Sequence, residues 1–222
     1  MTKRATVVAL CALAFATAAA ASTSDDGKQQ IRLTSADNAA ARHVVLRKAD
    51  FGGVPGWSGG AKKPDLSSSG PRCANFHPKY SDLVLTGIAE SEFQNSGVYI
   101  DDEVQMLKTA PMVRLDWQRS VRAPGLLLCL RTYLAKSAPA NAKVRGIQKL
   151  AFPRVAQYTA AFRLVLDVTA GGNTASMLLD LLLVARGRTE ITLTTVAPYE
   201  ARAPIKSAEE RLARGLVSRI RG

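Results

Sequence analysis

Four polar residues on three predicted strands carry the clearest chemical pattern in this sequence: Arg163, Asp167, Asp180 and Thr192. A guanidinium binds carboxylate or phosphate oxygens through two parallel hydrogen bonds. One interpretation is that these residues form the floor of a groove in which Arg163 recognises an anion and Thr192 hydrogen-bonds it. The alternative is structural, because opposite charges on facing strands also fix the register of a sheet.

Two predicted turns bring these residues together. A two-residue turn at Gly171-Gly172 places Arg163 opposite Asp180 and Asp167 opposite Ser176. On the other face, the same register gives the apolar pairs Phe162 with Leu181, Leu164 with Leu179, and Leu166 with Met177. A three-residue turn at Ala185-Arg186-Gly187 adds a third strand. It places Thr192 beside Asp180, Ile191 beside Leu181 and Leu193 beside Leu179.

Other candidate chemistry is sparse. Neither His43 nor His77 has a second ligand at a metal-binding spacing, so we expect no metal site there. Asp101 and Glu103 share one face of a strand, where they either coordinate Ca²⁺ or form a solubilising edge. The sequence contains no phosphate loop and no dinucleotide fingerprint. We therefore expect no cofactor and no catalytic activity.

Trp57 stands in a predicted loop from Gly52 to Gly70 that is rich in glycine, proline and serine. A loop of that length in a compact domain is functional or mobile. Either Trp57 packs against the core, or it lies at the rim of the polar groove and closes over a bound group.

The N-terminus has the pattern of a secretory signal peptide over residues 1–21. Lys3 and Arg4 precede an apolar run, and Ala19-Ala20-Ala21 supplies small residues for cleavage. Cys11 lies inside this run and leaves with it. Cys73 and Cys129 then remain in an oxidising compartment, where a disulfide between them is the expected outcome. No later apolar run reaches the roughly 18 residues of a membrane span, so the mature chain should have none.

The chain of 222 residues has 30 Lys and Arg against 18 Asp and Glu, a net charge of +12. Loss of residues 1–21 removes Lys3 and Arg4, which leaves 28 basic against 18 acidic residues, or +10. The cations are spread along the sequence, and an exported protein has no nucleic-acid partner to meet. The available polyanions are lipid head groups and wall polymers, so we expect an anionic envelope ligand. The oligomeric state does not follow from the sequence.

The elements after a linker over residues 22–34 alternate between helices and hairpins. We expect helices at 35–51, 112–121, 126–135 and 207–220, and strands at 83–93, 98–106 and 143–152 besides the hairpin strands described above. Asp37 or Ser35 can cap the first helix, and Ser207 with Glu210 forms a capping box at the last. This order predicts one α+β domain over residues 35–222, a curved antiparallel sheet with helices packed on one face.

Several short stretches resemble a known family: Leu46-Arg47-Lys48-Ala49-Asp50-Phe51 with Gly56-Trp57, Cys73, Ser81-Asp82-Leu83, Cys129, and Arg186-Gly187-Arg188. Over residues 35–221 the chain resembles exported, disulfide-bearing sensor-like domains of high-GC Gram-positive bacteria. These are related to the PknH-type extracytoplasmic sensor domains of receptor serine/threonine kinases and to the PsbP-like fold. The resemblance implies a curved sheet, helices on one side and a groove on the other.

Together these observations predict an exported, non-catalytic ligand-binding or sensor-like module of the cell envelope. Its ligand would be a small or polymeric anion, bound by Arg163, Asp180, Thr192, Asp167 and Trp57. The alternatives are an envelope hydrolase with a degenerate site and a structural envelope component.

Overall fold

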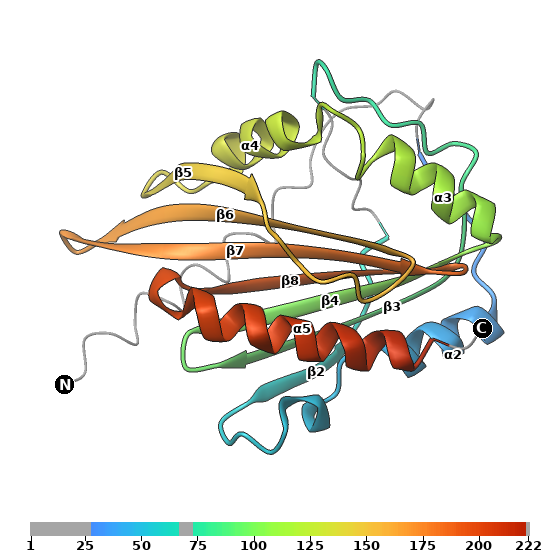
Figure 1. Ribbon diagram of the computed structural model, residues 1–222, viewed down its shortest axis with the longest axis horizontal. Coiled ribbons are helices and arrows are strands. Elements are labelled where there is room, and N and C mark those ends of the chain that lie inside the picture. The colour runs from blue at the N-terminus through green and yellow to red at the C-terminus, as the bar shows by residue number, and fades with distance from the viewer. Residues whose placement is uncertain (1–27, 67–72, 221–222) are drawn as a thin grey trace.

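The computed structural model describes residues 28–66 and 73–220, so the predicted signal peptide lies outside the described residues. Eight strands form one mixed sheet in the order β1-β3-β4-β8-β7-β6-β5, with β2 also pairing with β3 (Figure 1). The strands are β1 (Gln30–Ile31), β2 (Ser58–Lys62), β3 (Val84–Asn95), β4 (Val98–Leu107), β5 (Ala142–Lys149), β6 (Tyr158–Ala170), β7 (Asn173–Arg186) and β8 (Thr189–Pro198). Every pair is antiparallel except β1 with β3. Residues 30–31 of the predicted linker therefore belong to the sheet.

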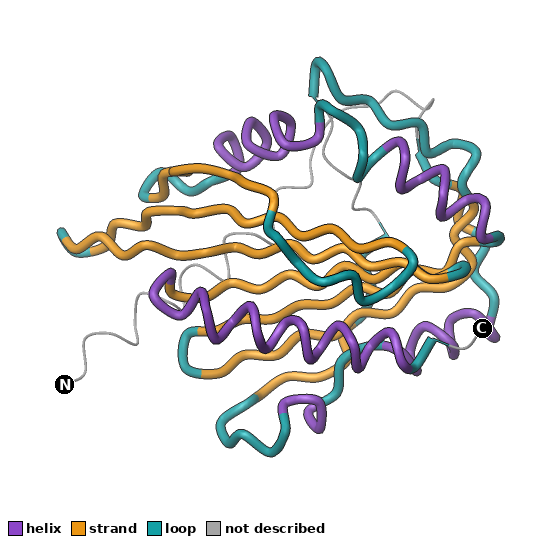
Figure 2. The backbone as a smooth tube through the Cα atoms, in the orientation of Figure 1, coloured by secondary structure: helices purple, strands orange, loops and turns teal. Residues whose placement is uncertain are grey.

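Helices cover both faces of the sheet, which corrects the expectation of a single covered face. The helices are α2 (Ser35–Val44), α3 (Ala110–Arg119), α4 (Leu126–Ser137) and α5 (Arg202–Ser218), with short 3-10 turns η2 (Lys48–Phe51) and η3 (Tyr199–Ala201). One core cluster joins α2 and α5 to the sheet, and a second joins α3 and α4 to it. Figure 2 shows α5 running across the sheet. The α+β class is confirmed.

The β6–β7 hairpin has the predicted register. Arg163 pairs with Asp180 and Asp167 with Ser176, around a turn at Gly171 and Gly172, both of which have positive φ. Apolar residues alternate along both strands, and the glycine turn joins them. Only one register then places the apolar residues of both strands on the same face.

The β7–β8 hairpin was predicted with the wrong register. Its turn has two residues, Gly187 and Arg188, and Gly187 has φ 59°, which suits glycine at the first position of a tight hairpin turn. Thr192 consequently pairs with Leu183, and Asp180 pairs with Thr195. Because successive side chains alternate between faces, Thr192 lies on the opposite face of the sheet from Asp180.

Strand β7 explains why the prediction failed. Leu181, Leu182 and Leu183 follow one another, so the strand is apolar on both faces and its pattern selects no register for β8. Leu182 packs with the α2–α5 cluster, while Leu181 and Leu183 pack with the α3–α4 cluster. A strand that is apolar on both faces requires cover on both faces.

Helix ends differ from the predicted caps. Thr34 caps α2 by accepting the Asp37 N–H at 3.1 Å, in place of Ser35 or Asp37. Helix α5 begins at Arg202. Pro204 therefore lies in its first turn, where proline is tolerated. The predicted capping box at Ser207 is therefore wrong: this residue lies inside the helix, where its hydroxyl donates to the Ala203 carbonyl at 3.4 Å.

The predicted long loop after Gly52 contains β2, which pairs with the outer edge of β3. Trp57, just before β2, is half-buried and stacks on Phe51 with ring centroids 4.0 Å apart. The predicted disulfide is confirmed: Cys73 and Cys129 are bonded, with their Cα atoms 5.5 Å apart. It ties α4 to the segment that precedes β3. No helix within residues 28–66 and 73–220 is long and apolar enough to cross a membrane.

Candidate functional site

A pocket of about 470 Å³ lies at the outer edge of β3, between the end of α2, η2 and β2. The outer edge of β3 is shared by two short strands, since β1 pairs with Val84 and Leu85 and β2 pairs from Glu90 onward. The uncovered edge between them supplies Ile88 and Ala89 to the pocket. We call this the basic pocket, because its lining includes four cationic side chains: Arg42, Arg47, Lys48 and Lys62.

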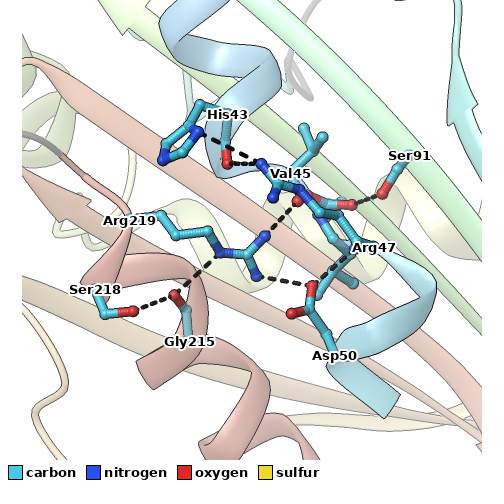
Figure 3. Close-up of polar contacts among 10 residues, drawn as sticks. His43, Val45, Arg47, Asp50, Ser91, Gly215, Ser218 and Arg219 are labelled. Atoms are coloured by element: carbon cyan, nitrogen blue, oxygen red, sulfur yellow. Dashed lines mark hydrogen bonds and ion pairs between the residues drawn. The ribbon is translucent and has the colours of Figure 1, made fainter. Parts of the chain in front are cut away.

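The wall of the basic pocket is the short connection between α2 and η2. The buried carboxylate of Asp102 accepts the Leu46 N–H at 3.1 Å and also accepts a hydrogen bond from the Ser91 hydroxyl (Figure 3). Burial raises the pKa of Asp102 to about 7, although both hydrogen bonds and the charge of Arg219 act to lower it. Asp102 thus anchors the connection between α2 and η2, which belongs to no helix or strand, by accepting its Leu46 N–H.

Arg219, at the end of α5, holds the same connection from the side. Its guanidinium donates to the Val45 carbonyl at 2.8 Å and to the Asp50 carboxylate at 2.7 Å (Figure 3). Asp50 also accepts the Arg47 N–H at 2.7 Å. The wall is therefore fixed by Asp102, 56 positions from Leu46, and by Arg219, 174 positions from Val45, so the pocket depends on the tertiary fold.

The four cations differ in what they already bind. Lys62 lies 3.3 Å from Glu90 and also pairs with Asp101. Partial burial disfavours its charge, but the hydrogen bond and the charge of Asp101 outweigh that effect, so the pKa of Lys62 lies above its ordinary value. Glu90 accepts the Asp65 N–H as well, at 3.0 Å. The acid in the pocket is thus already neutralised.

Arg42 and Lys48 are exposed at the rim, and neither side chain has an ion pair or hydrogen bond within the described part of the chain. Among the described residues, the guanidinium of Arg47 contacts only His43, at 2.8 Å from its carbonyl and 3.5 Å from its ring. The rim therefore presents cationic donors above an apolar floor that includes Phe93. Such a rim can bind carboxylate, sulfonate or phosphate oxygens.

The predicted polar groove is not open. Arg163 and Asp180 are 6% and 1% exposed, and they form a bidentate pair beneath α5. Arg163 also contacts the Arg202 carbonyl at 3.4 Å, so its donors are used within the protein. The prediction that this face forms a groove floor is wrong, because α5 covers it.

The other predicted site residues are dispersed. Asp167 accepts from the Ser176 hydroxyl at 2.7 Å and lies 3.6 Å from Arg145. Thr192 lies on the opposite face, paired with Glu103 of β4. Trp57 packs against the α2–α5 core cluster, and a ligand-binding role for it stays a prediction.

The acidic residues of β4 have protein partners. Asp101 and Glu103 share a face as predicted, and Lys62 pairs with Asp101. No group of three His, Cys, Asp or Glu side chains among the described residues is arranged to hold a metal ion. The predicted Ca²⁺ alternative therefore has no supporting geometry in this part of the chain.

The sequence shows its cations spread along the chain and does not group Arg42, Lys48 and Lys62. The pocket joins residues 42–48, 59–64 and 88–93, which only the pairing of β2 with β3 and the packing of α2 bring together. One sequence feature points to part of this arrangement. Gly59-Gly60 lies beside Lys62, and a glycine pair permits close approach to a neighbouring strand.

No family model matches the sequence, and no curated protein matches it. Among solved structures, the chain is similar to an Rv0999 ortholog from Mycobacterium smegmatis, with 11% identity and a TM-score of 0.45 over 84% of this chain and 98% of that one. It is also similar to the extracellular domain of PknH from Mycobacterium tuberculosis, with 9% identity and a TM-score of 0.46 over 82% and 95% of the two chains.

A third similar structure is LpqN of Mycobacterium tuberculosis, which is involved in cell envelope biogenesis. It shares 11% identity with a TM-score of 0.28 over 72% of this chain and 83% of that chain. The resemblance to PknH-type sensor domains expected from the sequence is thus found among solved structures as well, and it concerns the fold alone.

Proposed function

We propose that the protein is an exported, non-catalytic binding module of the cell envelope and that it holds an anionic ligand in the basic pocket. The observation that carries the proposal is the pair of exposed cations, Arg42 and Lys48, without partners in the described structure at the rim of a 470 Å³ pocket. Arg47 adds a third donor group beside them.

Two further features support this proposal. The Cys73–Cys129 disulfide suits an oxidising compartment outside the cytoplasm, as does the predicted signal peptide. Outside the membrane, the abundant anions carry phosphate or carboxylate groups on lipid heads and wall polymers. The cationic donors at the rim can bind the phosphate groups that occur on both lipid heads and wall polymers.

Thermal-shift measurements test the proposal with inorganic phosphate, glycerol 1-phosphate, and vesicles of phosphatidylglycerol or phosphatidylcholine. A ligand that binds only the folded protein raises Tm. The test variant is Arg42→Ala/Lys48→Ala. The matched control is Arg131→Ala/Lys136→Ala on α4, which removes the same charge from two exposed residues that have no described partner.

We expect the phosphate probes to raise Tm of the wild type and of the control, and to leave the pocket variant unchanged. A response to phosphatidylglycerol alone would assign the phosphate to a lipid surface, and a response to glycerol 1-phosphate would assign it to a free group. Equal loss of response in both variants would mean that net charge, and not the basic pocket, attracts the anion, and would overturn the proposal.

A further inference from the structure

A second pocket, of about 880 Å³, lies on the other side of α2 from the basic pocket. It is enclosed by α2, the C-terminal end of α5 and the β7–β8 turn, which come together at one end of the molecule (Figure 1). Its base is apolar and includes Ala40, Val44, Met106 and Ile220. The small alanine side chains of α2 leave this space open next to the sheet. We call it the α2–α5 pocket.

Two ion pairs between distant residues hold the pocket walls. Arg188 in the β7–β8 turn donates to both carboxylate oxygens of Asp37 on α2, at 2.8 and 3.3 Å. Arg219 on α5 holds the end of α2 through Val45 and Asp50, as Figure 3 shows. The walls are therefore formed by the protein itself and need no ligand to assemble.

Two side chains at this pocket, Arg186 and His43, can donate to a ligand. Arg186 is exposed, and its side chain has no partner among the described residues. The Nδ1 atom of His43 faces the guanidinium of Arg47 at 3.5 Å; because a guanidinium only donates, Nδ1 accepts and Nε2 carries the hydrogen. Asp37 is the one acid in the lining, and Arg188 neutralises it.

We propose that the α2–α5 pocket binds an anionic amphiphile: a molecule with an apolar body and one carboxylate, sulfonate or phosphate head. The apolar base favours such a body over a fully hydrated ion, because burial of apolar surface supplies the affinity. The head group binds at Arg186, with Nε2 of His43 as a second donor. The site is separate from the basic pocket, since the two contact opposite sides of α2.

The test uses 1-anilinonaphthalene-8-sulfonate, a fluorescent amphiphile with one sulfonate, and its uncharged analogue N-phenyl-1-naphthylamine. Arg186→Ala removes the head-group donor at an exposed position, where folding does not depend on it. Ala40→Leu fills the base with a residue that favours helix. Every protein in this test carries Arg42→Ala/Lys48→Ala, which removes the basic-pocket cations that can also bind a sulfonate. The control is Arg131→Ala on α4.

We expect the sulfonate probe to bind the wild-type α2–α5 pocket and the Arg131→Ala control with one Kd within twofold. Arg186→Ala should raise that Kd by about tenfold, the loss of one charge-assisted hydrogen bond. Ala40→Leu should raise the Kd for both probes, and Arg186→Ala should leave the Kd for the uncharged probe unchanged. If Arg186→Ala and Ala40→Leu bind the sulfonate probe as the wild type does, the proposal is wrong. Because the basic-pocket cations are absent from every protein in this test, failure here is distinct from failure of the proposed function.

Discussion

Glu209 of α5 and Asp180 of β7 face each other in the buried interface between helix and sheet, and both side chains are at most 2% exposed. Burial raises the pKa of Glu209 to about 8, and the charge of Asp180 adds to the rise. Arg163 and Thr195 act in the opposite direction without cancelling it. At neutral pH, Glu209 is therefore mostly a neutral acid beside the Arg163–Asp180 pair.

Because the pKa of Glu209 is higher in the folded protein than its ordinary 4.5, its contribution to stability is complete below pH 4.5 and is lost as the pH rises toward about 8. Glu209→Gln keeps the shape without the charge. We expect this variant to equal the wild type near pH 5 and to be more stable at pH 8 by on the order of 3 kcal/mol. Urea unfolding at both pH values measures the difference, with the exposed Glu200→Gln as the control. A constant difference between the two pH values would contradict the expected titration.

The Cys73–Cys129 disulfide should contribute strongly to stability, because it closes a loop with a sequence separation of 56. In the chain-entropy model, such a loop corresponds to about 4 kcal/mol. The double variant Cys73→Ser/Cys129→Ser should lose a comparable free energy of unfolding in non-reducing buffer. Intact mass before and after reduction and alkylation checks the bond itself. Two free thiols in the exported protein would refute it.

Asp102 should stabilise the α2–η2 connection through its hydrogen bond to the Leu46 N–H. Asp102→Ala leaves that buried N–H without an acceptor, which costs about 1–3 kcal/mol. Asp102→Asn keeps an acceptor oxygen of the same shape. The pKa of Asp102 is about 7, so at pH 6 the native group is mostly neutral and the Asn variant should match the wild type. Urea unfolding at pH 6 measures both, and an Ala variant as stable as the Asn variant would contradict this role.

The sequence was sufficient for the β6–β7 hairpin, because Arg163 and Asp180 interrupt two apolar strands at matching positions around one glycine turn. It was insufficient for the pairing of β8, because Leu181 to Leu183 of β7 are apolar on both faces and Gly187 fits a two-residue or a three-residue turn. Because the turn was ambiguous, the prediction placed Thr192 on the same face as Asp180 and interpreted that face as a groove. In the structure α5 covers that face.

The basic pocket could not be predicted for a different reason. Arg42 and Lys48 have no partner in the described structure that a sequence pattern could reveal. Their position depends on contacts between distant segments, such as Leu46 with Asp102 and Val45 with Arg219. Local periodicity carries no information on such pairs, whereas it does report strand alternation and helix faces.

Trp57 should contribute to stability by its stack on Phe51, and less than a fully buried tryptophan would. The rings are 4.0 Å apart and the indole is half-buried, so Trp57→Ala should cost about 1–3 kcal/mol. In a Trp117→Phe background, emission from Trp57 alone should be only partly accessible to iodide. Full protection from iodide, or a neutral Ala variant, would contradict this partly buried stack.

Gly59 and Gly60 both line the basic pocket, and they should respond oppositely to the same substitution. Gly59 has φ 133°, and a Cβ there would lie 2.0 Å from the Glu92 carbonyl oxygen, whereas a Cβ at Gly60 meets nothing within 4 Å. Gly59→Ala should therefore cost about 2 kcal/mol or more, because backbone cannot move away as a flexible side chain can. Gly60→Ala should stay within about 0.5 kcal/mol of the wild type. Urea unfolding compares the two, and equal stabilities would show that β2 does not lie against β3 as closely as this geometry requires.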